Sequence, residues 1–167
     1  MLLDIKQYPD PILRKKANKI DIVNKEIQRL LDDMAETMYN APGIGLAAPQ
    51  IGKSIKVIVT DITPRSESGE LIKLINPEII HAEGEELMEE GCLSVPGFTE
   101  TVKRAQKIVV RGINEKGKEV EIVAEGLLAR VFQHEIDHIE GRLFVDRLST
   151  LKKALFKRTI KKQLKKG

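Results

Sequence analysis

Apolar residues at helical spacing mark the first long element of the chain. Between positions 24 and 39 they recur every three or four residues, which is the period of one helix face. They are Ile27, Leu30, Leu31, Met34 and Met38. Asn24 is suited to cap the first turn, and the sequence NAPG at 40–43 ends the pattern. We therefore predict a helix over 24–39, preceded by a shorter one over 11–17.

The middle of the chain changes to runs of β-branched residues. The runs at 55–62 and 71–80 are separated by the turn-forming loop TPRSESGE, and those at 107–114 and 118–124 flank the tight turn EKG. We predict four strands, the last two as a hairpin. Helical spacing returns over 127–139 and again from 149 onward. This order predicts an α+β fold of antiparallel or mixed sheets packed around the helix at 127–139, with a C-terminal helix.

The composition is that of one soluble globular domain. Hydrophobic residues make up 41% of the 167 positions and charged residues 32%, enough for a single core. We find neither a secretory leader nor an apolar run of membrane-spanning length. The single cysteine, Cys92, cannot form an internal disulfide, which suits a reducing compartment. We therefore expect a cytoplasmic protein without a membrane partner.

The charges are divided unevenly along the chain. Residues 142–167 hold ten basic residues and one acid, whereas the rest of the chain holds 18 basic and 24 acidic residues. The net charge of +3 is therefore the sum of a negatively charged body and a positively charged tail. Among the lysines of the tail, leucines and an isoleucine recur at roughly helical intervals, which predicts an amphipathic basic helix. They are Leu148, Leu151, Leu155, Ile160 and Leu164.

The sequence HEIDH at 134–138 predicts a metal site on the helix at 127–139. His138 lies about 40° round the helix from His134, and Glu135 shares their face. Two neutral imidazoles can bind one divalent ion, while the glutamate beside them takes a proton from the activated water. The alternative is two histidines on a solvated helix face by accident. The helical context of the motif favours the metal.

A catalytic site of this kind needs a third protein ligand. Phe144 stands where a metzincin would have its third histidine, and Asp146 is the only acid beyond Glu140. Both observations argue against a ligand downstream. Upstream, His81 lies in the polar stretch IIHAEGEE and has the surroundings of a surface residue. Cys92, in EEGCLSVPG, would by itself be interpreted as a small buried apolar residue, but beside an incomplete two-histidine site it is the better candidate.

Three stretches together resemble the signature motifs of bacterial peptide deformylase. They are GIGLAAPQ (43–50), EGCLSVP (90–96) and QHEIDHIEG (133–141), and the similarity extends from YPDPILRKKA to RLFVDRL. The resemblance implies metal-dependent hydrolysis of the N-formyl group from the formylmethionine of nascent polypeptides, with release of formate. It also implies that Cys92, His134 and His138 bind one divalent metal ion. That ion is Fe²⁺ in the cell, with Zn²⁺ or Ni²⁺ as alternatives in the isolated protein.

The resemblance further implies roles for the residues around the metal. Glu135 would move protons between water and the departing amine. The side-chain amide of Gln50 and the backbone N–H of Leu93 would stabilise the oxyanion. Substrate contacts are expected from Ile44, Gly45, Gly91, Arg130 and Val131. A phosphate-loop interpretation of the two glycines in GIGLAAPQ is disfavoured, because we expect no strand to run directly into a helix there.

Four charged residues near the motifs have alternative interpretations. Arg130 points either to the rim of the substrate pocket or into solvent as an ordinary helix arginine. Glu90 and Arg104 are expected to form an ion pair behind the cysteine, and Asp137 to orient a ligand histidine; each is otherwise a surface charge. The segment GFTET lacks the arginine that some family members carry after the cysteine motif.

The resemblance and the basic tail together suggest how the chain is organised. We expect residues 1–147 to form the catalytic body and residues 148–167 a basic C-terminal helix within one domain. That helix either packs on the body as a solubilising element or docks electrostatically on ribosomal RNA; we expect no DNA partner. The rival functions are a metallopeptidase that cuts internal bonds and a non-enzymatic RNA-binding protein with a structural metal.

Overall fold

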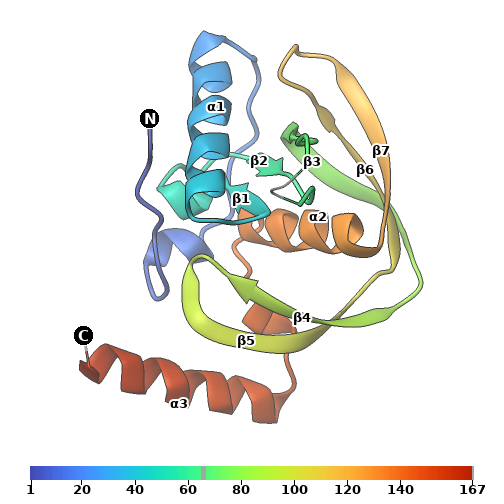
Figure 1. The fold of residues 1–167 in the computed structure, drawn as a ribbon. Coiled ribbons are helices and arrows are strands. Elements are labelled where there is room, and N and C mark those ends of the chain that lie inside the picture. The colour runs from blue at the N-terminus through green and yellow to red at the C-terminus, as the bar shows by residue number, and fades with distance from the viewer. Residues whose placement is uncertain (65–66, 167) are drawn as a thin grey trace.

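The computed structural model describes residues 1–64 and 67–166, and helix α2 (Gly126–Ile139) lies at its centre (Figure 1). The helix is held there by apolar side chains on one face. Ala129, Phe132 and Ile139 are completely buried against a five-stranded sheet. The helix predicted over 127–139 is confirmed, as is the packing of sheets around it.

The five-stranded sheet is antiparallel throughout, in the order β1-β2-β3-β6-β7. Its strands are β1 (Gly45–Ala47), β2 (Val57–Thr60), β3 (Ile72–Glu83), β6 (Lys107–Ile113) and β7 (Glu119–Glu125). All four predicted strands are present, and the predicted hairpin joins β6 to β7 through Gly117, whose φ of +81° suits a residue without a side chain. The short strand β1 was not predicted, and it forms one edge of the sheet.

A second sheet of two antiparallel strands lies on the other side of α2 (Figure 1). It consists of β4 (Glu86–Cys92) and β5 (Val95–Arg104), neither of which was predicted. The sequence of β4, ELMEEGC, is rich in glutamate and lacks β-branched residues, so only its pairing with β5 reveals it as a strand. The register shifts between Glu90 and Cys92, at the end of the strand.

Helix α1 (Lys25–Asn40) covers the sheet near β1 and β2. Asn24 caps it as predicted, because its side-chain oxygen accepts a hydrogen bond from the Ile27 N–H at 2.9 Å. Leu31, Met34 and Met38 are fully buried. Three 3-10 helices complete the body: η1 (Pro11–Arg14), η2 (Ala48–Ile51) and η3 (Phe144–Arg147).

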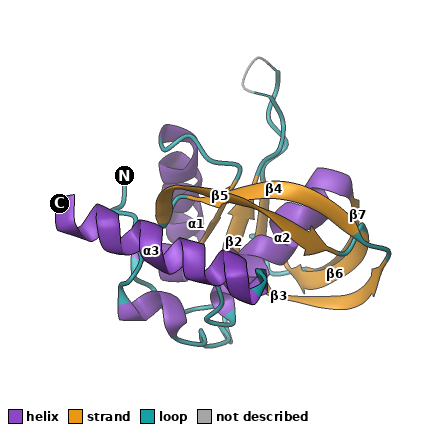
Figure 2. Cartoon of the chain, turned by 90° about the horizontal axis from the view of Figure 1, so that it is seen from below, coloured by secondary structure: helices purple, strands orange, loops and turns teal. Residues whose placement is uncertain are grey.

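Helix α3 (Thr150–Lys166) runs along one side of the molecule, next to β5 (Figures 1 and 2). The predicted helix is confirmed. Only part of the predicted apolar stripe faces the body, and the other residues of the stripe are exposed. Leu151 and Leu164 are 72% and 60% exposed, whereas Phe156 and Ile160 are buried. The Phe156 ring lies 5.0 Å from that of Phe98 on β5. Within the described part of the chain, no helix is both long and apolar enough to cross a membrane.

Candidate active site

Three possible metal ligands from two distant parts of the chain converge beside α2. The Nε2 atoms of His134 and His138 are 3.2 Å apart, and the Sγ atom of Cys92 lies 3.3 Å from the Nε2 of His138. All three ligand atoms lie within 4.8 Å of one another. The helical i, i+4 spacing brings the histidines together, and the end of β4 supplies the sulfur.

The chemistry of this trio fits a divalent metal ion. A thiolate and two neutral imidazoles each direct an electron pair at the same point. Ligands at the bond lengths typical of zinc, about 2.0–2.3 Å, lie roughly 3–4 Å apart around one ion. The two distances to His138 Nε2, 3.2 and 3.3 Å, are of this size. The ring of Phe144, which occupies the position of a metzincin histidine, stacks on His134 with centroids 6.0 Å apart. His81, the other candidate ligand, is exposed and pairs with Glu83.

A buried ion-pair cluster lies behind the histidines. Glu90 accepts hydrogen bonds from His134 Nδ1 at 2.9 Å and from Arg104 at 2.6 and 2.9 Å. Burial by itself would raise the pKa of Glu90, but the hydrogen bonds from His134 and Arg104 outweigh it and lower the pKa to about 2. The expected pair of Glu90 and Arg104 is therefore present. Glu90 fixes the orientation of the His134 ring and turns its Nε2 toward the cysteine.

Asp137 does not orient a ligand histidine, contrary to our expectation. Its carboxylate accepts hydrogen bonds from Arg104 at 2.9 Å and from Arg147 at 2.7 and 2.9 Å. The physical reason is its position on α2, about 60° round from His134 and away from His138. Burial opposes the ionised form, but the two arginines outweigh this effect and hold the pKa of Asp137 below its ordinary value.

Glu135 faces a pocket on the other side of the histidines. Its carboxylate is buried, and Oε1 has no hydrogen-bond partner among the described residues. Burial raises the pKa of Glu135 to about 7, although the charges of His134 and Arg104 act in the opposite direction. Gly45 leaves the space for this carboxylate, since a Cβ atom at position 45 would lie 2.5 Å from Glu135 Oε2.

Gln50 is buried next to the cysteine, with its amide group held in one orientation. Its Oε1 accepts a hydrogen bond from the Ala47 N–H at 3.0 Å, which turns Nε2 toward Ser94 Oγ at 3.1 Å and Cys92 Sγ at 3.7 Å. Leu93 lies next to Cys92 in the turn after β4. Among the backbone hydrogen bonds of the described residues outside helices and strands, none involves the Leu93 N–H. Both residues that were expected to supply donors, Gln50 and Leu93, therefore line the pocket beside the sulfur.

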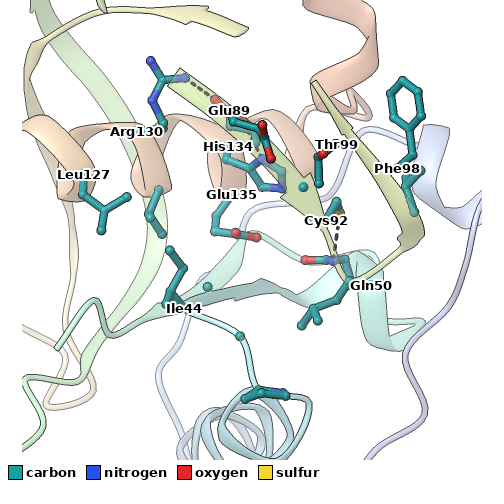
Figure 3. Close-up of a pocket in the computed structure, with 18 of the residues that line it drawn as sticks. Ile44, Gln50, Glu89, Cys92, Phe98, Thr99, Leu127, Arg130, His134 and Glu135 are labelled. Atoms are coloured by element: carbon teal, nitrogen blue, oxygen red, sulfur yellow. Dashed lines mark hydrogen bonds and ion pairs between the residues drawn. The ribbon is translucent and has the colours of Figure 1, made fainter. Parts of the chain in front are cut away.

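The pocket has a volume of about 420 Å³ and is open to solvent. Figure 3 shows Cys92, His134, Glu135 and Gln50 turned toward one another around it. Its lining includes most of the predicted site residues. They are Ile44, Gly45, Gln50, Gly91, Cys92, Leu93, Arg130, Val131, His134 and Glu135. His138 lies deeper and is only 1% exposed.

Arg130 differs from both interpretations of the sequence. It contributes to the pocket lining, but its side chain is only 3% exposed, so it is not a solvated helix arginine. Its guanidinium is directed at Glu90 and at the carbonyl oxygens of Val102 and Glu86, and it is not free at the pocket rim.

Several residues of the site were missed in the sequence. Ser94, Phe98, Thr99 and Leu127 contact the pocket or its donors. Ser94 could have been found from its place in the cysteine motif. Phe98 and Thr99 lie on the unpredicted strand β5, and nothing in their own sequence indicated a site.

Comparisons with known proteins agree with this geometry. A family model described as polypeptide deformylase matches residues 2–154. The peptide deformylase of Thermodesulfovibrio yellowstonii is 55% identical over 160 residues, which are 96% of this chain and 97% of that protein.

Solved structures point to the same family. The peptide deformylase of Thermus thermophilus superposes with a TM-score of 0.92 at 42% identity, covering 99% of this chain and 97% of the other. That of Legionella pneumophila superposes with a TM-score of 0.91 at 47% identity, covering 99% and 96%. Both rival functions are thereby excluded as the primary activity. The chain belongs to the polypeptide deformylase family, the metal-dependent hydrolases that remove the N-formyl group from nascent peptides.

Proposed function

We propose that Cys92, His134 and His138 hold one divalent ion, and that the formyl group of a nascent peptide is hydrolysed next to it. The observation that carries this proposal is the convergence of the three ligand atoms within 4.8 Å of one another, at the wall of a pocket that also contains Glu135 and Gln50. When bound, the ion supplies a Lewis acid that lowers the pKa of water and polarises the formyl carbonyl.

The protein's own groups then have distinct tasks. Glu135 takes a proton from the attacking water and delivers it to the departing amine, because its carboxylate has an unpaired oxygen beside His134. The Gln50 amide and the Leu93 N–H donate hydrogen bonds to the oxygen that becomes negative in the tetrahedral intermediate. The hydrogen bond from Ala47 to Gln50 prepares this donor before substrate arrives.

The substrate is an extended peptide that begins with formylmethionine. β1 pairs on one side only, and so does β4, and both strands line the pocket through Gly45 and Gly91. The backbone of a peptide between them can add to these two edges by strand-like hydrogen bonds. Ile44 and Val131 supply apolar contacts for the methionine side chain, together with the buried stem of Arg130.

The working metal in the cell is proposed to be Fe²⁺, and Zn²⁺ or Ni²⁺ would bind the same ligands in the isolated protein. A ferrous thiolate site is sensitive to oxygen. We expect the iron-loaded enzyme to lose activity in air and to keep it under anaerobic handling. Equal rates of decay in the two conditions would contradict iron as the working metal.

We also propose that α3 brings the enzyme to the ribosome in the cytoplasm, where nascent chains emerge. Residues 1–147 form the catalytic body in this proposal, and 148–167 the docking element. The lysines at 153, 157, 161, 162, 165 and 166 are exposed on α3, whereas Phe156 and Ile160 attach the helix to the body. A lysine-rich surface binds phosphate-rich RNA in a salt-dependent manner.

A metal analysis coupled to a formate-release assay tests the proposed function. We expect one divalent ion per chain and formate release from formyl-Met peptides. Peptides with an acetylated or a free N-terminus should be poor substrates, because the pocket then has the wrong acyl group or none. Cleavage of internal peptide bonds without release of formate would contradict the proposal.

A further inference from the structure

The cysteine and the histidines of the site belong to elements that are joined mainly by charged and polar side chains. Helix α2 packs on the five-stranded sheet through an apolar core. Its connections to the two-stranded sheet include ion pairs and hydrogen bonds of Arg130, His134 and Asp137. Gln133 adds hydrogen bonds to Ala105, the residue that follows β5. Relative motion across this joint would change the distance between the thiolate and the imidazoles.

Arg130 crosses this joint and makes contacts with both strands of the two-stranded sheet, beyond its ion pair with Glu90. It lies one helical turn before His134, on the same side of α2. Its guanidinium donates to the Glu90 carboxylate, to the carbonyl oxygen of Val102 at 2.9 Å and to that of Glu86 at 2.7 Å. One side chain on the helix therefore holds both β4 and β5, and it contacts the carboxylate that orients His134.

The charge balance indicates that Arg130 has more than a neutralising role. Arg104 already pairs with Glu90 through two hydrogen bonds and with Asp137 through a third. Arg147 supplies a second cation to Asp137. The cluster thus contains three arginines for two carboxylates, and burying an additional guanidinium has a desolvation cost. A leucine or methionine at position 130 would line the pocket without this cost.

We propose that Arg130 is a positioning residue for the metal centre. It acts through Glu90 on His134, and through the backbones of β4 and β5 it fixes how closely Cys92 approaches the histidines. This inference rests on the proposed metal ligands but is independent of the substrate. Removing the guanidinium should loosen the site, since hydrogen-bonding partners of metal ligands typically contribute about 10- to 100-fold to metal affinity.

The test uses Co²⁺ as a spectroscopic probe in the full chain. The unmodified protein, Arg130→Met and the control Arg111→Met are titrated with Co²⁺ against a chelator, and the thiolate-to-cobalt charge-transfer band is recorded. Arg111 is a matched control because it forms two ion pairs but is half exposed on β6. We expect Arg130→Met to raise the dissociation constant about 10- to 100-fold and to weaken or shift the band. Arg111→Met should change neither by more than about two-fold.

The outcomes separate this inference from the proposed function. A normal band and unchanged affinity in Arg130→Met would overturn the positioning role alone. Absence of the band in the unmodified protein would overturn the ligand set and this inference with it. If Arg130→Met does not fold, Arg130→Lys decides: lysine keeps a charge near Glu90 but cannot hold both strands. At least about three-fold weaker binding then supports the proposal, and unchanged binding overturns it.

Discussion

Charged side chains have opposite environments on the two sides of helix α2: on one side they are paired with one another, and on the other side a carboxylate oxygen is unpaired among the described residues. Arg130 and Asp137 lie about 40–60° to one side of His134, and both are in the ion-pair cluster. Glu135 lies about 100° to the other side, in the pocket, with one oxygen unpaired among the described residues. The pKa of Glu90 in the cluster is about 2, because its hydrogen bonds outweigh burial, whereas burial raises that of Glu135 to about 7.

The difference shows how one helix can supply both rigidity and reactivity. On the cluster side every carboxylate is paired, so its charge is fixed and the side chains that it holds are fixed as well. On the pocket side a carboxylate with a free oxygen can exchange a proton with a substrate group. The comparison predicts that substitutions on the pocket side change catalysis, and that substitutions on the cluster side change stability and metal binding.

The largest effect is expected on the pocket side. Glu135→Gln keeps the shape of the side chain but cannot accept a proton, so kcat should fall by roughly 100- to 10,000-fold. The metal content should stay at one ion per chain, because Glu135 is not a proposed ligand. Formate release and elemental analysis measure the two quantities on the same sample. Activity close to that of the unmodified enzyme would remove Glu135 from the mechanism.

Substitutions in the ion-pair cluster are expected to lower the free energy of unfolding. Arg104→Met removes the partner that Glu90 and Asp137 share but leaves each carboxylate another arginine, so we expect the free energy of unfolding to fall by about 1–3 kcal/mol. Arg111→Met, which removes half-exposed pairs, should lower it by less than about 1 kcal/mol. Urea unfolding of both variants checks the contrast. An equal decrease in the free energy of unfolding of both variants would show that the buried cluster stabilises the fold no more than exposed ion pairs do.

A smaller effect on catalysis is expected from Gly45→Ala. The new methyl group would lie 2.5 Å from Glu135 Oε2 and 2.9 Å from Val131 Cγ1, so the carboxylate must move. A displacement of about 1 Å in a catalytic group can cost about 100-fold in rate, and we expect kcat/KM to fall by roughly 10- to 100-fold. The metal affinity should not change. An alanine variant of unaltered activity would mean that the carboxylate has no fixed position.

Charges outside both regions should matter least to the chemistry. Replacing the exposed Lys153, Lys157 and Lys161 of α3 by glutamine should leave hydrolysis of a short formylated peptide within about two-fold, and it should weaken ribosome binding at low salt. The matched control replaces three exposed lysines of the body, at positions 19, 53 and 116. Equal ribosome affinity in both triple variants would contradict a docking role for α3.

Much of the fold was predictable because its signals are local. The apolar period and the cap at Asn24 define α1, and the EKG turn defines the β6–β7 hairpin. The strand β4 could not be recognised, because its one buried glutamate, Glu90, is stabilised by Arg104 and Arg130 from other elements. The face of α3 was also predicted only in part, since its contact with the body depends on Phe98 and Tyr8.

The site was predictable where a motif carries its own geometry. Spacing alone places His134 and His138 together, and the cysteine motif supplied the sulfur once a third ligand was required. The partners of Arg130 and Asp137 could not be deduced, because they depend on how β4 and β5 cross α2 in space. The assignment of Asp137 to a histidine failed for this reason: neighbours in sequence point to different sides of a helix.

X-ray absorption spectroscopy of the zinc- or iron-loaded protein tests the central claim most directly, namely that one thiolate and two imidazoles share one ion. The account predicts one sulfur ligand at about 2.3 Å and two imidazole nitrogens at about 2.0–2.1 Å for zinc. The sulfur signal should disappear in Cys92→Ser. A spectrum without sulfur in the unmodified protein, or one that Cys92→Ser leaves unchanged, would contradict the claim.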